Sequence, residues 1–209
     1  MRRLALAAFV AVLSTLAAAE AMATALDLGS DRPVRKRWQR SRVESSIGVK
    51  DLTIVRAHLG LSAPMGNFGD AYGSGLGFGG SIGYGVGENI ILSGGIARHQ
   101  FDHDEFTNVD ATITPVTLNV DFALPTGGRA VPWVGLGTGL YHVSESTDTG
   151  PATITESENN FGVNMGIGFG APISNRTLFG AGLKLHYVSG DQFIDTPFFT
   201  FQLGFGFIL

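Results

Sequence analysis

The chain has no cysteine, few charged residues and no long apolar run beyond its N-terminus. The absence of cysteine excludes disulfide bonds, thiolate metal sites and a lipid-modified cysteine at a signal cleavage point. Only 15% of the 209 residues are charged, although 44% are hydrophobic. Because no stretch of about 20 apolar residues follows the N-terminal segment, transmembrane helices do not explain this composition. Apolar residues that alternate with small or polar ones do explain it.

The first 25 residues have the features of a secretory signal peptide. Two arginines precede an apolar stretch at residues 4–16, and small residues follow it. This order is typical of exported proteins. Cleavage after Ala19, Ala23 or Ala25 fits equally well. The predicted domain organisation is a signal peptide at 1–25, a basic periplasmic extension at 26–51 and an outer-membrane β-barrel at 52–209.

The predicted extension carries a basic cluster and no period-two pattern. The members of the cluster are Arg32, Arg35, Lys36, Arg37, Arg40 and Arg42. Nucleic-acid binding would need a folded basic surface or interleaved aromatic residues, and the single Trp38 is weak support for it. We therefore expect no nucleic-acid partner. From Val43 onward acidic residues outnumber basic ones and fall mostly in predicted loops.

Residues 198–209 separate into two faces when every second residue is taken. One face carries Phe199, Phe201, Leu203, Phe205, Phe207 and Leu209, and the other carries Thr200, Gln202, Gly204 and Gly206. Successive side chains of a strand point to opposite faces, so this pattern predicts a β-strand. The second face is too small and polar for an ordinary core. We therefore expect the apolar face to contact lipid, as in a transmembrane barrel.

Seven earlier stretches repeat this pattern, although the third of them is the least clear. They lie at about residues 54–63, 75–86, 90–101, 112–124, 131–143, 161–171 and 178–188. The connections alternate between tight turns and longer polar loops, of which 144–160 is the longest, as outer-membrane barrels require. Pro115 predicts a bulge or a late start in the fourth strand. The predicted fold is all-β, an eight-stranded antiparallel up-and-down transmembrane β-barrel.

The last eight residues resemble the C-terminal signal that the outer-membrane barrel assembly machinery recognises. The pattern consists of Gln202, Gly204, Phe207 and Leu209, although most such proteins end on Phe. Over residues 54–209 the chain resembles the small outer-membrane β-barrel domain family, the OmpA-type and porin-like eight-stranded proteins. This resemblance implies the outer membrane of a Gram-negative cell. The expected partners are membrane lipid, lipopolysaccharide, the assembly machinery and surface ligands of the outer loops.

Five inward positions carry ionisable side chains: Arg56, His58, Asp121, Lys184 and His186. Unpaired charges in a narrow lumen are costly, so we expect a salt-bridged network that keeps the barrel rigid and closed. The alternative is an ion or proton path, because the glycine rows could leave water-filled pockets. Eight strands enclose a space just wide enough for side chains to fill, which favours the closed barrel.

Two loops carry residues of types that occur in active or metal sites. His142 and Ser144, with Glu156 and Glu158, form a Ser/His/acid set that resembles that of outer-membrane lipid A deacylases. The residue order beyond the pair does not match, and chance readily produces such a set. A second group, Asp102, His103, Asp104 and Glu105, has oxygen ligands without EF-hand spacing. We expect solvated loops at both places, with no metal and no cofactor.

These observations predict a noncatalytic barrel with a structural or surface-interaction role. A narrow porin-like channel for small solutes or ions is the alternative. A lipid A modifying enzyme is a remote alternative.

Overall fold

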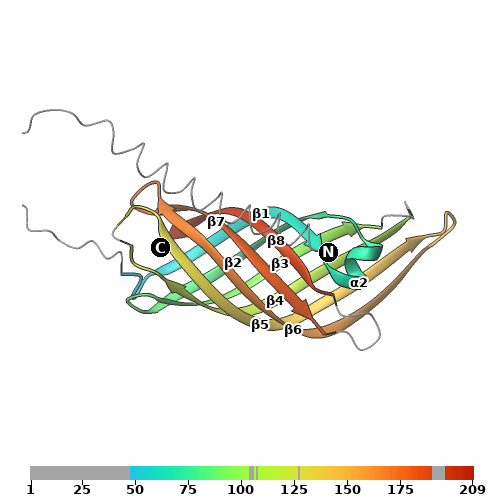
Figure 1. Cartoon of the computed structure of the whole chain (residues 1–209), viewed down its shortest axis with the longest axis horizontal. Coiled ribbons are helices and arrows are strands. Elements are labelled where there is room, and N and C mark those ends of the chain that lie inside the picture. The colour runs from blue at the N-terminus through green and yellow to red at the C-terminus, as the bar shows by residue number, and fades with distance from the viewer. Residues whose placement is uncertain (1–47, 104–105, 107, 127, 190–195) are drawn as a thin grey trace, which may run out of the picture.

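The computed structural model describes residues 48–209 except 104–105, 107, 127 and 190–195. Within these residues, eight strands form a closed barrel in which every strand runs antiparallel to its neighbours (Figure 1). The strands are β1 (Thr53–Pro64), β2 (Gly75–Gly87), β3 (Ile90–Asp102), β4 (Val109–Ala123), β5 (Val131–Asp148), β6 (Thr153–Pro172), β7 (Thr177–Val188) and β8 (Phe198–Ile208). A short helix, α2 (Gly66–Ala71), follows β1. The predicted fold class is confirmed.

The predicted signal peptide and most of the basic extension fall in residues 1–47, outside the described residues. No helix in the described part of the chain is long and apolar enough to cross a membrane. The order of strands around the barrel follows the sequence, and β8 closes the barrel by pairing with β1.

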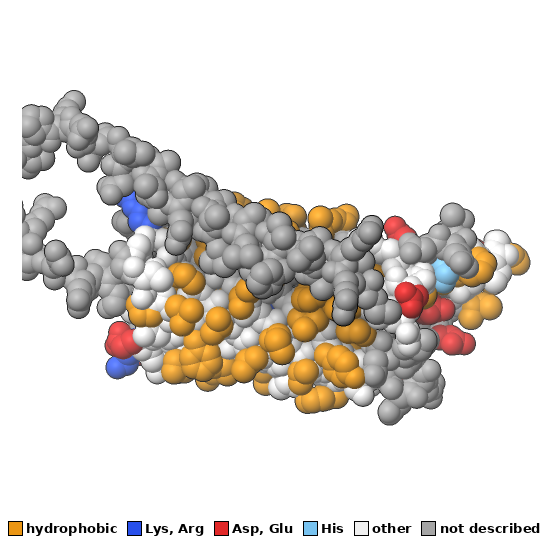
Figure 2. All heavy atoms as spheres, in the orientation of Figure 1, with side chains coloured by type: hydrophobic (Ala, Val, Ile, Leu, Met, Phe, Trp, Pro, Cys, Tyr) orange, Lys and Arg blue, Asp and Glu red, His pale blue; other side chains and the backbone are white. Residues whose placement is uncertain are grey.

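The outward faces of the strands form an apolar belt around the barrel wall. Large side chains on this face are mostly solvent-accessible, as shown by Leu118 at 71% and Leu59 at 66% exposure. In Figure 2 hydrophobic side chains cover much of the wall, and charged ones gather at the two ends. Exposing so large an apolar surface to water would be unfavourable, whereas contact with lipid stabilises it. The period-two pattern of the sequence thus corresponds to an outer face toward lipid and an inner face toward the lumen.

Two strand predictions need correction. β5 and β6 extend through most of the segment that we predicted as the loop at 144–160, because alternating polar residues still form a ladder outside the bilayer. The predicted bulge at Pro115 is also wrong, since the register between β4 and β5 runs without a shift from Val109↔Thr147 to Ala123↔Trp133. On the other side, β3 and β4 keep the same register before and after the proline.

Glycines on the lumen face make room for large side chains from neighbouring strands. The Trp133 ring lies over Gly168 and Gly182, where an added Cβ would come within 2.7 and 2.8 Å of its Cζ2 atom. The Tyr141 ring lies in the same way over Gly162, with Cε2 2.6 Å from the position of a Cβ. These glycines therefore hold aromatic rings rather than empty space.

This packing predicts different effects for two glycines of β6. Gly162→Ala should lower the free energy of unfolding by about 2 kcal/mol, because the methyl group overlaps the Tyr141 ring and the barrel must shift to accept it. Gly170→Ala is the matched control, since nothing lies within 4 Å of its Cβ position. It should change stability little or raise it slightly, as replacing a strand glycine usually does. Urea unfolding of the refolded barrel in detergent measures both. Equal losses in the two variants would contradict the packing argument.

Candidate functional site

A buried apolar cluster, which we call the outer plug, crosses the lumen near its outer end. It consists of Phe68, Tyr72, Phe101, Ala111, Ile113, Tyr141, Val143, Val188 and Phe198. The α2 helix lies at the end of the barrel that carries the long loops (Figure 1). Its Phe68 ring packs edge-on against Phe101, with 5.2 Å between the ring centroids. Phe101 in turn packs against Phe198 at 5.6 Å, and both rings are fully buried. These buried rings therefore close the lumen beneath a pocket of about 520 Å³ that lies between α2 and the outer parts of β4 and β5.

Histidines lie directly beneath the outer plug. The His186 ring stacks on Phe198 at 4.5 Å with an interplanar angle of 4°, and its Nδ1 is 3.0 Å from the Tyr141 hydroxyl. The centroid of the His99 ring is 5.7 Å from that of His186. The Nδ1 atom of His99 is 2.8 Å from the Ser62 hydroxyl. Within the described residues no group of three His, Cys, Asp or Glu side chains could hold a metal ion.

The structure joins two of the five ionisable residues predicted in the lumen. Arg56 of β1 donates from Nη1 to Asp121 Oδ2 of β4 at 2.8 Å, so the ion pair links two strands that are not neighbours in the barrel. The side chain of Lys184, on β7, makes no ion pair or hydrogen bond with any described residue. The set is thus one ion pair and a separate lysine, with His58 and His186 lining the same space.

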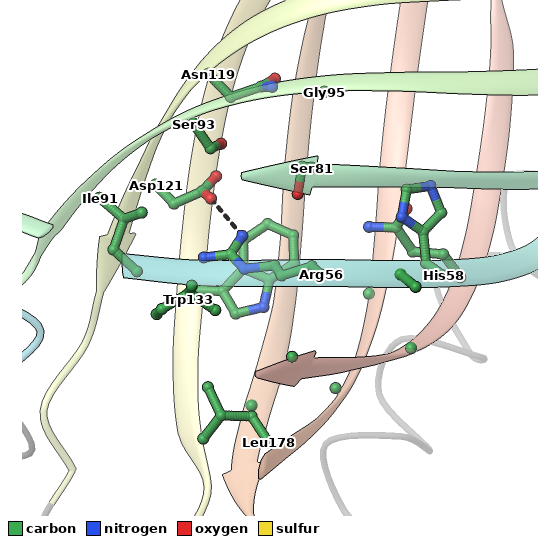
Figure 3. A pocket seen from close by; sticks show the side chains of 18 of the residues that line it. Arg56, His58, Ser81, Ile91, Ser93, Gly95, Asn119, Asp121, Trp133 and Leu178 are labelled. Carbon is green, nitrogen blue, oxygen red and sulfur yellow. Dashed lines mark hydrogen bonds and ion pairs between the residues drawn. The ribbon is translucent and has the colours of Figure 1, made fainter. Parts of the chain in front are cut away.

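Below the histidines the lumen is not filled, and we call this space the inner cavity. Its volume is about 210 Å³, and Figure 3 shows Arg56, Asp121, Trp133 and other lining side chains around it. The lining continues to the ends of the strands, where Val131 and Pro172 lie next to the short turns. Short turns face the periplasm in this type of barrel, so the inner cavity lies toward the periplasmic side.

The outer parts of β5 and β6, residues 142–159, form what we call the outer hairpin. Leu140 and Phe161 pair with each other and are the last outward-facing apolar residues before it. The Tyr72 hydroxyl donates to Glu145 Oε2 at 2.6 Å, which ties the outer plug to the outer hairpin. Burial, followed by this hydrogen bond, raises the pKa of Tyr72, so its hydroxyl stays protonated and remains the donor.

The outer hairpin does not assemble the predicted Ser/His/acid set. His142 Nδ1 lies 3.0 Å from Asn159 Oδ1, and Ser144 pairs across the hairpin with Ser157. Glu156 pairs with Glu145, whose side chain faces Tyr72. The Glu156 carboxylate therefore lies on the opposite face of the hairpin from His142 and Ser144.

The predicted acidic group at 102–105 is only partly described by the structure. Asp104 and Glu105 lie outside the described residues. Asp102 ends β3, and His103 forms an isolated bridge with Tyr72.

Sequence reasoning missed two contributors to the lumen, α2 and His99. The apolar face of residues 90–101 is interrupted, so the inward side of that strand was uncertain. His99 nevertheless shares its parity with Ser93, which faces the lumen, and this parity is the signal that locates it. For α2 the available signal was the spacing of Phe68 and Tyr72, since aromatic residues four apart lie on one side of a helical turn.

The predicted assembly residues all lie on β8 or just after it. Gln202 and Gly204 face the lumen, whereas Phe207 and Leu209 are outward and 49% and 77% exposed. Phe207 pairs with Val55 of β1, and the Leu209 amide donates to the Thr53 carbonyl at 3.0 Å. The end of the chain therefore also closes the barrel.

Deleting residues 207–209 should block insertion into the outer membrane while leaving export intact. The deletion removes both the predicted assembly signal and the pairing of β8 with the start of β1. Membrane fractionation, combined with gel mobility before and after boiling, measures insertion and folding. Leu209→Phe is the control and should insert as well as the wild type or better. Normal insertion of the shortened chain would contradict the signal.

Comparison with solved structures finds the same fold in outer-membrane proteins. Neisserial surface protein A has a TM-score of 0.58 at 15% identity, over 74% of this chain and 96% of that one. OprG from Pseudomonas aeruginosa has a TM-score of 0.56 at 14% identity, over 78% and 97%. Ail, the attachment invasion locus protein of Yersinia pestis, has a TM-score of 0.53 at 17% identity, over 77% and 99%. At these identities the likeness shows the fold alone.

Sequence comparison adds the family. No curated protein matches the chain. The family model of the outer membrane protein beta-barrel domain matches residues 5–207, which is nearly the whole chain. The closed barrel and its apolar belt agree with this match. The chain therefore belongs to the outer membrane protein beta-barrel domain family and is a protein of the cell outer membrane.

Proposed function

We propose that this protein is a closed, noncatalytic barrel that presents the outer hairpin to partners at the cell surface. The observation that carries the proposal is the outer plug, whose buried rings cross the lumen on the side of the hairpin. A barrel closed in this way is unsuited to passing solutes, so its exposed feature is the hairpin itself. The separation of His142 and Ser144 from the hairpin carboxylates supports the noncatalytic part.

The outer hairpin has the reach and the charge for surface contacts. Each of its strands extends past the apolar belt by roughly 20 Å, at about 3.3 Å per residue, and Figure 1 shows the paired ends of β5 and β6 projecting beyond the barrel. Its charged residues are Glu145, Asp148, Glu156 and Glu158, with no lysine or arginine among residues 142–159. A surface with one sign of charge steers partners of the opposite sign.

The acidic hairpin favours a basic partner such as a cationic protein or peptide. Ail of Yersinia pestis has been solved in complex with the heparin analogue sucrose octasulfate, a polyanion. The same ligand would be repelled by the outer hairpin of this chain. The shared barrel is therefore compatible with a different class of surface ligand.

Neutralising the outer hairpin should weaken binding to a basic protein by about tenfold, because several long-range attractions are lost together. The variant is Asp148→Asn with Glu156→Gln and Glu158→Gln, which keeps Glu145 and its bond to Tyr72. Binding of lysozyme, a basic protein, to barrels reconstituted in uncharged phosphatidylcholine vesicles measures the effect. Glu88→Gln, in the turn between β2 and β3 at the opposite end, is the control and should change nothing. Equal binding by the neutralised variant, or tighter binding of heparin than of lysozyme, would contradict the proposal.

A further inference from the structure

We infer that the inner cavity binds a small carboxylate with a short apolar tail, which enters from the periplasmic side and is held by Lys184. This site is separate from the outer hairpin and does not depend on the proposed surface role. Its elements are an excess of positive charge, an unused polar atom, apolar walls and an opening at one end.

The charge of the inner cavity is unbalanced. Among the described residues that line it, Arg56 and Lys184 are basic and Asp121 is the one acidic residue. Asp121 is already engaged by Arg56 at 2.8 Å, and its attraction to Lys184 acts beyond ion-pair distance. The other titratable side chains that face Lys184 are histidines, which supply no negative charge. A buried cation without a counter-charge is costly, so an anion in the cavity is stabilised.

A second polar group points to the same class of ligand. His99 lines the inner cavity and is buried, yet its Nε2 has no hydrogen-bond partner among the described residues. Its Nδ1 is 2.8 Å from the Ser62 hydroxyl. When that hydroxyl donates to Nδ1, the proton of the neutral ring is on Nε2, so Nε2 is a buried donor that lacks an acceptor among the described residues.

The remaining walls suit an apolar tail of limited length. Ile54, Ile91, Trp133 and Leu178 line the cavity, and Figure 3 labels the last three among its lining side chains. A volume of about 210 Å³ accommodates a molecule the size of a short-chain acid rather than a full acyl chain. Because the outer plug closes the other end, the ligand enters past Val131 and Pro172 at the turns.

The test uses Trp133 as a reporter, because it lines the cavity and the chain has only 2 tryptophans. Trp38→Phe leaves Trp133 as the single tryptophan in the refolded full chain. Titration with hexanoate should change its emission saturably, and hexanol, with the same tail and no charge, should bind at least about tenfold more weakly, as expected for loss of a charge-assisted contact. Lys184→Met should weaken hexanoate to the level of hexanol.

The matched control is Arg98→Met, a basic residue of β3 that faces outward and away from the cavity. It should leave hexanoate binding unchanged. Gel mobility before and after boiling verifies that each variant forms a barrel. Should Lys184→Met fail to fold, the comparison of hexanoate with hexanol in the Trp38→Phe protein still decides. Equal affinity for the two probes, undiminished hexanoate binding in folded Lys184→Met, or no saturable response would overturn the inference and leave a cavity that holds water only.

Discussion

Phe198→Ala is expected to lower the free energy of unfolding by about 3 kcal/mol or more, the usual cost of truncating a buried phenylalanine. Phe198 is fully buried and contacts Phe101, His99 and His186, with ring centroids 5.6, 5.1 and 4.5 Å away. Phe101 and His99 lie on β3 and His186 lies on β7, so the ring of Phe198 connects β8 both to its neighbour β7 and, through the lumen, to β3. The closed barrel leaves these side chains little freedom to move into the cavity that Phe198→Ala would create.

The same substitution should create a path for ions. The wild-type barrel should show no steady conductance in planar bilayers, because the buried rings of the outer plug cross the lumen. Phe198→Ala removes the ring that joins the plug to the histidines, so conductance should appear or become frequent. Steady conductance of the wild type at the level of the variant would overturn the closed-barrel view and favour the narrow channel.

Phe199→Ala is the matched control for both measurements. It is the same change one position along β8, on the face that points to lipid. Lipid tails replace the lost ring contacts, so the burial of apolar area gives little net stabilisation there. This variant should unfold at nearly the wild-type urea concentration and stay closed. A loss equal to that of Phe198→Ala would show that the effect belongs to the strand and not to the outer plug.

Asp121→Ala should cost on the order of 3 kcal/mol, because it leaves Arg56 without its partner and removes the one carboxylate among the described residues that line the cavity with Lys184. The Asp121 side chain is 8% exposed, so water cannot readily replace it, whereas Arg56 at 32% retains some solvation. The cost therefore lies at the lower end of the range for breaking a buried pair. Urea unfolding in detergent measures it.

A double variant separates the ion pair from other effects. Arg56→Met combined with Asp121→Ala removes both charges and should recover most of the stability lost in Asp121→Ala. Asp121→Ala alone should also bring no change in conductance. A small cost together with cation-selective conductance in the wild type would mean that water solvates these charges along an open channel.

The strands of this barrel could be located from the sequence because lipid and lumen impose opposite demands on successive residues. At Phe199 and Thr200, for example, the face follows from parity alone. The same rule failed beyond Val143, where both faces of the strand are polar and the alternation disappears. There the ladder between β5 and β6 continues without alternating apolar residues, so the sequence predicted a loop at 144–160.

The contents of the lumen were less accessible to sequence reasoning. Parity placed Arg56, Asp121 and Lys184 inward, but which of them meet depends on the tilt and stagger of the strands. The resulting contact joins β1 with β4 and leaves Lys184 apart. The closure by α2 depends on tertiary contacts of Phe68, and a six-residue helix has too few turns for a periodic pattern.

The packing of Trp133 on Gly168 and Gly182 also acts on strand alignment during insertion. A one-residue slip of β6 would turn Ile167 or Phe169 into the lumen beneath the indole. A slip of β7 by two residues in one direction would place Lys184 there instead of Gly182. Either error produces a steric overlap with a rigid ring rather than a merely weaker contact. The barrel can therefore close without steric overlap at the indole only when β5, β6 and β7 are in the correct register together.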